Sequence, residues 1–255
     1  MALQKTEAIV LKSQRQGETS KILTLYTRKF GKMKVIAKGA RSTHSRFAGT
    51  LEPTNYIAIV FYEKENRELQ FLSQAEIIET FAKKKQNLEK AALALAACEL
   101  VDRLEVGAAS NPRLFKLLLE SLRATHQAHD LLMNCFRAFQ IHLLEIMGIK
   151  PELNVCISCK QSRSGEAVFD IRHGGFYCER CLASRPPGMF IIAEAMQALK
   201  IFQKSSLTNL NGLALSPAAE QQIEVFLNAY FNYHIDGFKE LNAIKFLKKI
   251  SSRSH

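Results

Sequence analysis

The sequence predicts a mixed α+β protein in which a five-stranded β-barrel comes first and an α-helical domain with a four-cysteine insertion follows. Three observations predict this class. Short segments rich in Val, Ile, Phe and Tyr fill the first eighty residues, Ala- and Leu-rich segments follow, and two C-x2-C pairs interrupt them. A chain of 255 residues with 47 % hydrophobic residues can bury the cores that such a protein needs.

Five segments of the first eighty residues are predicted as strands. Turn residues separate them, among them Gly17, Gly31, Gly39 and Pro53. Five short strands in this length favour a small closed barrel, and a barrel of this size is typical of the OB-fold. The predicted strands are TEAIVLK, TSKILTLYTRKF, GKMKVIAKG, NYIAIVFYE and ELQFLSQAEII.

From about Phe81 the pattern changes to that of helices. Residues 87–105 are rich in Ala and Leu, and residues 129–149 form a long apolar stretch that ends before Pro151. Two further helices have clear starts, since Asn and Ser are favoured N-caps and Pro suits the first helical position. These starts are Asn111–Pro112 and Ser216–Pro217, and the segment IIAEAMQALKIFQ after residue 189 is also predicted as helix. We expect the helices to pack as a bundle.

Two C-x2-C pairs lie between the helical segments, with eighteen residues between the pairs. Each pair forms a tight turn in which two thiolates converge on one cation, and two such turns complete the four-sulfur tetrahedron that zinc favours. Four thiolates leave no open position for water, so the spacing predicts one structural zinc ion. The intervening EAVFDIRHGGFY is predicted as a β-hairpin that turns at Gly174 and Gly175. The predicted ligands are Cys156, Cys159, Cys178 and Cys181.

Other uses of the cysteines remain open from spacing alone. A redox dithiol would suit either pair separately, and an iron–sulfur cluster also takes four cysteines. His173 could replace one ligand, although a residue beside a complete set of four is more typical of an exposed turn. Cys98 and Cys135 lie inside apolar helical stretches and are predicted as core residues.

The positive charge of the chain is concentrated near its N-terminus. The formal net charge is +11, and the first fifty residues hold eleven Lys or Arg against only Glu7 and Glu18. This concentration indicates a polyanionic partner, since each phosphate that Lys or Arg neutralises releases condensed counterions. A merely soluble basic surface is the alternative, because charge by itself identifies no ligand.

The segment KMKVIAKGARSTHSRF, residues 32–47, supplies the candidate nucleic-acid contacts and contains no acidic residue. In its strand, the period of two places the lysines on one face and Met33, Val35 and Ala37 on the other, which should enter the barrel core. The lysines then project at intervals of about 6 to 7 Å, close to the phosphate spacing of an extended single strand. The following loop adds two arginines. The candidates are Lys32, Lys34, Lys38, Arg41 and Arg46.

Some of these features also have a purely structural interpretation. Lysines protect edge strands from aggregation, which would account for Lys32 and Lys34. Aromatic residues near the basic segment could stack on bases, but each single one is more typical of core packing. The aromatic candidates are Tyr26, Phe47, Tyr56 and Tyr62.

No catalytic constellation is recognisable in the sequence. The patterns G-x-S-x-G, G-x-x-x-x-G-K-[ST] and H-x-E followed by P-C-x-x-C are missing, as are paired carboxylates suited to magnesium. We therefore expect a binding protein and not an enzyme. The first residues lack a signal-peptide pattern and no apolar run reaches about 18 residues, which predicts a cytoplasmic protein with no membrane partner.

Several motifs together resemble one protein family. The opening EAIVLKSQRQGETSKILTLYTRKFGKMKVIAKGAR contains FGK and AKGAR, the cysteine insertion begins GIKPELNVCISC, and it closes GGFYCERC. In this order they resemble the bacterial recombination-mediator family RecO over nearly the whole chain. The C-terminal IDGFKELNAIKFLKK matches the family only loosely.

The resemblance implies an OB-fold, a helical domain with a zinc-ribbon-like module, and a function without catalysis. Proteins of this family bind single- and double-stranded DNA, anneal complementary strands, and work with RecR to load RecA onto DNA coated by single-strand-binding protein. The expected partners are therefore DNA, RecR and the C-terminal tail of single-strand-binding protein, with a functional link to RecA and a location near the nucleoid. The family's basic residues after the third strand correspond to Lys34, Lys38, Arg41 and Arg46.

The expected domains are an OB-fold in residues 1–80, a helical domain in residues 81–150 and 190–255, and a four-cysteine zinc module in residues 151–189. Two rival functions remain open. A zinc-ribbon protein–protein adaptor would have an incidental basic surface and no DNA affinity. A metal-dependent nuclease would cleave DNA when magnesium is added.

Overall fold

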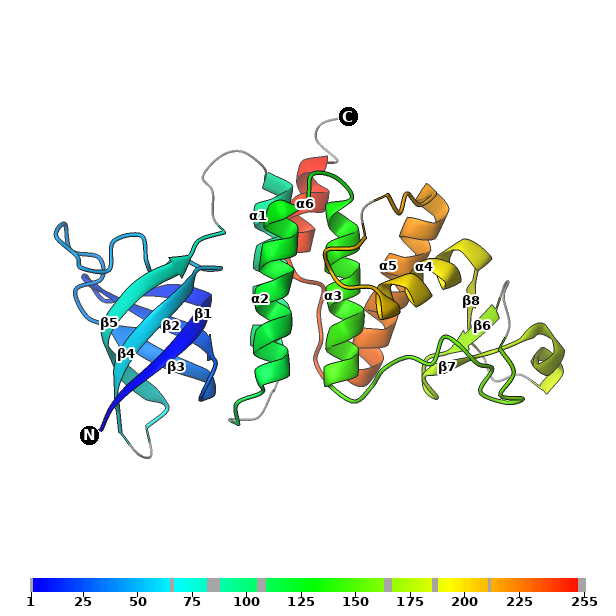
Figure 1. The fold of residues 1–255 in the computed structure, drawn as a ribbon, viewed down its shortest axis with the longest axis horizontal. Helices are drawn as coiled ribbons and strands as arrows, with labels where there is room; N and C mark the ends of the chain where they lie inside the picture. The colour runs from blue at the N-terminus through cyan, green and yellow to red at the C-terminus, as the bar shows by residue number, and fades with distance from the viewer. Residues whose placement is uncertain are drawn as a thin grey trace. The chain divides into compact units, whose positions relative to one another are not determined.

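The computed structural model describes residues 2–64, 67–81, 88–104, 109–162, 167–184, 188–210 and 212–251. The chain forms two compact units, one of Met1–His126 with Leu241–His255 and one of Gln127–Glu240 (Figure 1). The expected domains instead divide the chain at residues 80, 150 and 189, and they remain a prediction.

Five strands make up the β-sheet of the first unit, and each overlaps a predicted strand. β1 pairs with both β2 and β4, so the sheet closes on itself in the order β1-β2-β3-β5-β4 (Figure 1). The pairing of β3 with β5 is parallel, and the other four pairings are antiparallel. The strands are β1 (Ala2–Gln16), β2 (Ser20–Thr27), β3 (Gly31–Ala37), β4 (Tyr56–Glu63) and β5 (Leu69–Glu79).

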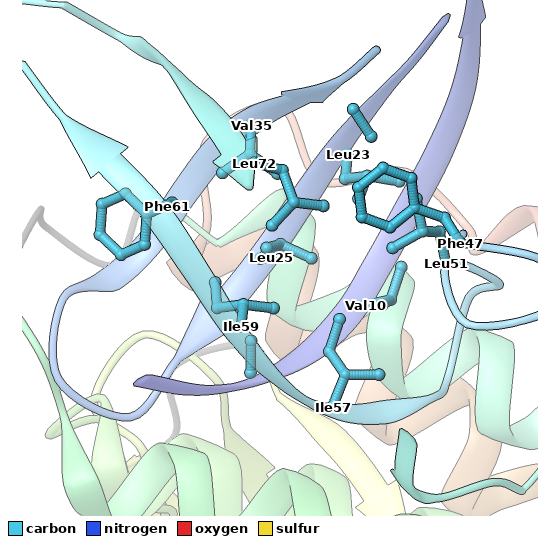
Figure 2. Packing of buried hydrophobic residues seen from close by; sticks show 12 residues of the cluster. Val10, Leu23, Leu25, Val35, Phe47, Leu51, Ile57, Ile59, Phe61 and Leu72 are labelled. Atoms are coloured by element: carbon cyan, nitrogen blue, oxygen red, sulfur yellow. The ribbon is translucent and has the colours of Figure 1, made fainter. Parts of the chain in front are cut away.

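The core of this sheet is built from alternate residues of β1 to β4, and β5 adds Leu72 (Figure 2). In β3, Val35 and Ala37 are fully buried in the core and Met33 packs against it, which confirms the predicted inward face. The loop between β3 and β4 contributes Phe47 and Leu51, which lie together beside the strands. The period of two therefore turns the side chains of Lys34 and Ile36 away from the core.

Three helices complete the first unit: α1 (Leu88–Arg103), α2 (Pro112–Gln127) and α6 (Asn242–Ser251). The start of α2 is as predicted, since the side chain of Asn111 accepts a hydrogen bond from the backbone N–H of Leu114. α6 packs against α1, and the carboxylate of Glu99 in α1 accepts hydrogen bonds from the first backbone N–H groups of α6. A carboxylate suits this position because the N-terminus of a helix carries partial positive charge.

The second unit combines three helices with a small sheet. Its helices are α3 (Leu132–Ile146), α4 (Ala193–Lys204) and α5 (Pro217–His234), and the side chain of Ser216 caps α5 as predicted. Its sheet has the order β7-β6-β8, from β6 (Ala167–Asp170), β7 (Gly175–Tyr177) and β8 (Met189–Ile191), with a 3-10 helix η1 (Glu179–Ser184). β6 and β7 form the predicted hairpin, and Gly174 in its turn has the positive φ of +64° that favours glycine.

Among the described residues, no helix is both long and apolar enough to cross a membrane.

Candidate nucleic-acid interface and metal centre

The four predicted cysteine ligands come together in the second unit. Their sulfur atoms all lie within 4.8 Å of one another, and the Sγ atoms of Cys159 and Cys178 are 3.8 Å apart. Zinc–sulfur bonds of about 2.3 Å in a tetrahedron place the sulfurs about 3.8 Å apart. The four thiols are therefore arranged so that they could hold one metal ion.

Backbone hydrogen bonds position the first cysteine pair. The N–H of Lys160 donates to the carbonyl of Cys156, and the N–H of Cys178 donates to the sulfur of Cys156 at 3.4 Å. Burial raises the pKa of the Cys156 thiol, but hydrogen bonds from the backbone N–H groups of Cys159, Cys178 and Ser158 outweigh it and bring this pKa to about 6. A thiolate at this position is ready to bind a cation.

The other cysteines and His173 lie apart from this cluster. Nδ1 of His173 is 2.7 Å from the carboxylate of Asp170, which also accepts the backbone N–H of His173, so the histidine is the turn residue that the sequence favours. Cys98 and Cys135 are buried in α1 and α3, as predicted. Burial raises the pKa of Cys98 to about 12, so its thiol is not reactive at neutral pH.

Two of the predicted DNA contacts, Lys34 and Lys38, have exposed side chains on the outside of the barrel. Lys34 lies in β3 between Thr24 of β2 and Leu69 of β5 in the strand register. The Nζ atom of Lys38 lies 5.4 Å from the ring centre of Phe71. Because β3 pairs on both sides, it is not an edge strand, and protection of an edge does not account for its lysines in the folded protein.

Lys32 has a different environment from the other lysines of β3. Its ammonium group donates to the carbonyl oxygens of Asp102 at 2.8 Å and Leu104 at 3.1 Å, at the C-terminal end of α1. A cation stabilises the negative end of a helix dipole. Lys32 is thus engaged in holding β3 to α1, which the period of two alone does not predict.

The two arginines of the loop also differ from each other. Arg41 donates through Nη1 to the carbonyl oxygens of Gly17 and Glu18, so its guanidinium ties this loop to the β1–β2 turn. Arg46 is exposed, and its guanidinium lies 4.9 Å from the ring centre of Phe47. Phe47 itself is buried in the barrel core.

The aromatic candidates separate into buried and exposed residues. Tyr26 and Tyr56 are buried, and their rings pack with Phe115 of α2 at centroid distances of 6.5 and 6.0 Å. Only Tyr62 among these candidates is exposed, and its ring centre lies 6.4 Å from that of Phe71. Sequence reasoning did not single out Phe71, although its alternation with the core residue Leu72 could have indicated an outward position.

The charge is unevenly divided between the two units. Residues 127–240 hold ten Lys or Arg and eleven Asp or Glu, so the second unit is close to neutral. Between Glu18 and Glu52 the chain has no acidic residue at all. The remaining residues, which form the first unit, hold 25 Lys or Arg and 13 Asp or Glu, so the net positive charge of the chain belongs to this unit, whose barrel carries the exposed lysines.

Family models match almost the entire chain. The model "Recombination protein O N terminal" matches residues 1–81, and "Recombination protein O C terminal" matches residues 85–241. The chain belongs to the recombination protein O (RecO) family. This confirms the resemblance noted in the sequence.

RecO-family relatives match along most of their length. "DNA repair protein RecO" of Bacillus pumilus (strain SAFR-032) is 32 % identical over 250 residues, which cover 96 % of this chain and 96 % of the relative. The protein of the same name from Bacillus subtilis (strain 168) is 32 % identical over 253 residues, or 99 % and 97 % of the two chains. That of Salinibacter ruber (strain DSM 13855 / M31) is 30 % identical over 232 residues, or 91 % and 88 %. Membership in the RecO family supports a role in DNA repair and recombination.

Proposed function

We propose that this RecO-family protein binds single- and double-stranded DNA during repair and anneals complementary strands without catalysing a bond change. The observation that supports this most is the group of exposed cations Lys34, Lys38 and Arg46 on the barrel, in a segment that has no acidic residue. Lys and Arg at such positions neutralise phosphates and release their counterions. Two strands whose phosphates are neutralised repel each other less, so base pairing can proceed.

The barrel itself is proposed to be an OB-fold. The strand order β1-β2-β3-β5-β4 with a closing parallel pair is the feature that favours this fold, which commonly binds oligonucleotides on its outer face. β3 then presents its lysines on the DNA-binding side.

The four cysteines are proposed to hold one structural zinc ion in a zinc-ribbon-like module. The residues fit this ion, since four thiols in reach of one centre make the closed shell of structural zinc sites. When bound, the zinc would stabilise the turns around Cys156 and Cys178, whereas the DNA contacts lie in the other unit.

We further propose that the protein works with RecR and with the C-terminal tail of single-strand-binding protein, and that it helps to load RecA. Family membership supports these partners. RecR and the tail are proteins, so they would bind to surfaces other than the cations that contact phosphates. The cationic barrel would then supply the DNA affinity of the assembly.

Charge reversal of two exposed cations tests the proposed function. In the variant Lys34→Glu with Arg46→Glu, we expect the affinity for a labelled single strand, measured by fluorescence anisotropy, to fall by about tenfold or more. The annealing rate of complementary strands should fall with it. Neither side chain forms a hydrogen bond in the described part of the chain that would be lost, so the fold should be kept.

A matched control separates local contact from overall charge. The variant Lys116→Glu with Lys204→Glu makes the same change of net charge at exposed positions of α2 and α4. It should retain most of the DNA affinity. Equal loss in both variants, or no loss in the first, would contradict the proposed function.

A further inference from the structure

A row of apolar side chains crosses the outer face of the barrel. The strand register places Ile22 opposite Ile36, Ile36 opposite Phe71, Phe71 opposite Tyr62, and Tyr62 opposite Leu3. The neighbours of these residues in their strands, such as Leu23, Val35 and Leu72, lie in the core, so the row faces outward. We call Leu3, Ile22, Ile36, Tyr62 and Phe71 the apolar row.

The part of the apolar row from Phe71 to Leu3 is open to solvent. Leu3 is 55 % exposed and Tyr62 39 % exposed, while Phe71 is partly exposed. The rings of Tyr62 and Phe71 are inclined by 53°, with centroids 6.4 Å apart. Such a row is unusual on a solvated sheet face, which normally carries polar residues.

Lysines border the apolar row on both sides. Lys34 and Lys38 lie two positions before and after Ile36, and both are exposed. The ammonium group of Lys38 lies over the ring of Phe71. Lys5, also exposed, follows Leu3 by two positions in β1. An apolar surface with Lys34 on one side and Lys38 and Lys5 on the other complements a strand that has apolar base faces and a phosphate backbone.

We propose that the apolar row is a base-stacking platform for single-stranded DNA, with Tyr62 and Phe71 as the stacking rings and Lys34 and Lys38 on the flanking phosphates. The proposal rests on the proposed function and adds strand selectivity to it. In a duplex the base faces are stacked inside the helix, so they cannot reach the rings. A strand that finds its complement therefore loses the stacking contacts, which favours release of the annealed product.

The chain contains no tryptophan, so Tyr62→Trp introduces a single tryptophan, whose emission can be followed apart from that of the tyrosines, into the apolar row. We expect oligothymidylate to quench the fluorescence of Trp introduced at this position. An abasic strand of the same length and a duplex should leave the emission nearly unchanged. The control Tyr233→Trp, at a position 53 % exposed on α5 of the other unit, should not respond to any of the three.

Affinities separate stacking from phosphate contact. The variant Tyr62→Ala with Phe71→Ala should bind oligothymidylate about tenfold or more weakly than the unmodified protein, since base–aromatic stacking contributes about 1–3 kcal/mol per base. Its affinity for the abasic strand should stay the same, and Tyr62→Phe should retain both affinities. Urea denaturation of the double variant, compared with the unmodified protein, checks that it is folded.

Four outcomes would overturn the stacking platform. If both strands bind tightly but the introduced tryptophan is not quenched, or if the double alanine variant keeps its preference for thymidylate, the platform is wrong and the phosphate interface stands. If the fluorophore responds to an acidic apolar peptide and not to DNA, the row is a protein-docking surface. If neither strand binds the unmodified protein, the proposed function fails as well.

Discussion

Lys32 and Lys34 lie on the same face of β3, yet their ammonium groups have different partners. Lys32 binds the last carbonyl groups of α1, whereas Lys34 is exposed between Thr24 and Leu69. Two hydrogen bonds from a cation to a helix C-terminus contribute to stability, while an exposed lysine contributes little. The strand therefore uses one lysine to fix its position and leaves the next one free for a ligand.

This difference predicts that the same substitution lowers stability at Lys32 and lowers DNA affinity at Lys34. Lys32→Gln should lower the free energy of unfolding by about 1 kcal/mol, measured by urea denaturation, because the carbonyls of Asp102 and Leu104 lose a charged donor. Lys34→Gln should leave stability within about 0.5 kcal/mol and weaken DNA binding. A Lys32→Gln protein of normal stability that binds DNA as weakly as Lys34→Gln does would show that Lys32 is a phosphate contact instead.

At this scale the sequence predicts which side a residue faces better than what it contacts. The alternation in β3 correctly places Val35 and Ala37 in the core. It does not predict that Lys32 donates hydrogen bonds to the end of α1, or that Arg41 donates to the carbonyls of Gly17 and Glu18. Those partners lie far away in the sequence. Likewise, the surroundings of Tyr62 depend on the register of β4 with its two neighbours, β1 and β5.

Among the elements, the hairpin β6–β7 is short and depends on what surrounds it. Its two strands have four and three residues, and an isolated hairpin of this size is unstable in water. β8 adds a third strand, one cysteine pair precedes β6, and the other begins at Cys178, directly after β7. A metal ion bound by the four thiols would therefore add a further link between the first cysteine turn and the hairpin, beside the hydrogen bond from the N–H of Ile157 to the carbonyl of Phe176.

Removal of the metal should loosen this region selectively. After treatment with a strong zinc chelator, we expect faster amide hydrogen exchange in residues 151–162 and 167–184, while exchange in the strands of the barrel stays slow. The purified protein should contain about one zinc ion per chain, and Cys178→Ser should lose it.

Cys135→Ser provides the control for this measurement, because Cys135 lies in the core of α3 and outside the cluster. This variant should keep its zinc. A zinc content near zero in the unmodified protein, with iron present, would indicate an iron–sulfur cluster in place of the structural zinc.

Elements with strong local signals are predicted well from the sequence. The five strands of the barrel and the capped starts of α2 and α5 agree with the structure. β8 has only three residues, and its pairing with β6 is not a local property, so nothing in its own sequence marks it as a strand. The OB-fold designation and the zinc ion remain predictions.

For the whole molecule, the division of charge between the units predicts the salt dependence of DNA binding. The logarithm of the association constant should fall linearly with the logarithm of salt concentration, by about 0.7 per neutralised phosphate of a single strand. Lys34→Gln with Arg46→Gln should make this slope shallower by about 1.4, because two contacts are lost. Titration by anisotropy at several salt concentrations measures it.

Two cations of the second unit provide a control for the salt dependence of DNA binding. Arg172→Gln with Lys204→Gln removes two exposed cations from a unit that is nearly neutral. The slope should stay as in the unmodified protein. A shallower slope for this variant would show that the second unit also meets the phosphates.

The contact between Glu99 and α6 has a consequence for synthesis of the protein. α6 follows the whole second unit in the sequence, yet it belongs to the first unit, where Glu99 binds the backbone N–H groups of Asn242 and Ala243. During translation the barrel, α1 and α2 leave the ribosome long before α6 does. Until then this carboxylate lacks its helix partner and one side of α1 stays uncovered. A premature stop codon anywhere in residues 127–240 would therefore leave both units unfinished, including the one encoded upstream of it.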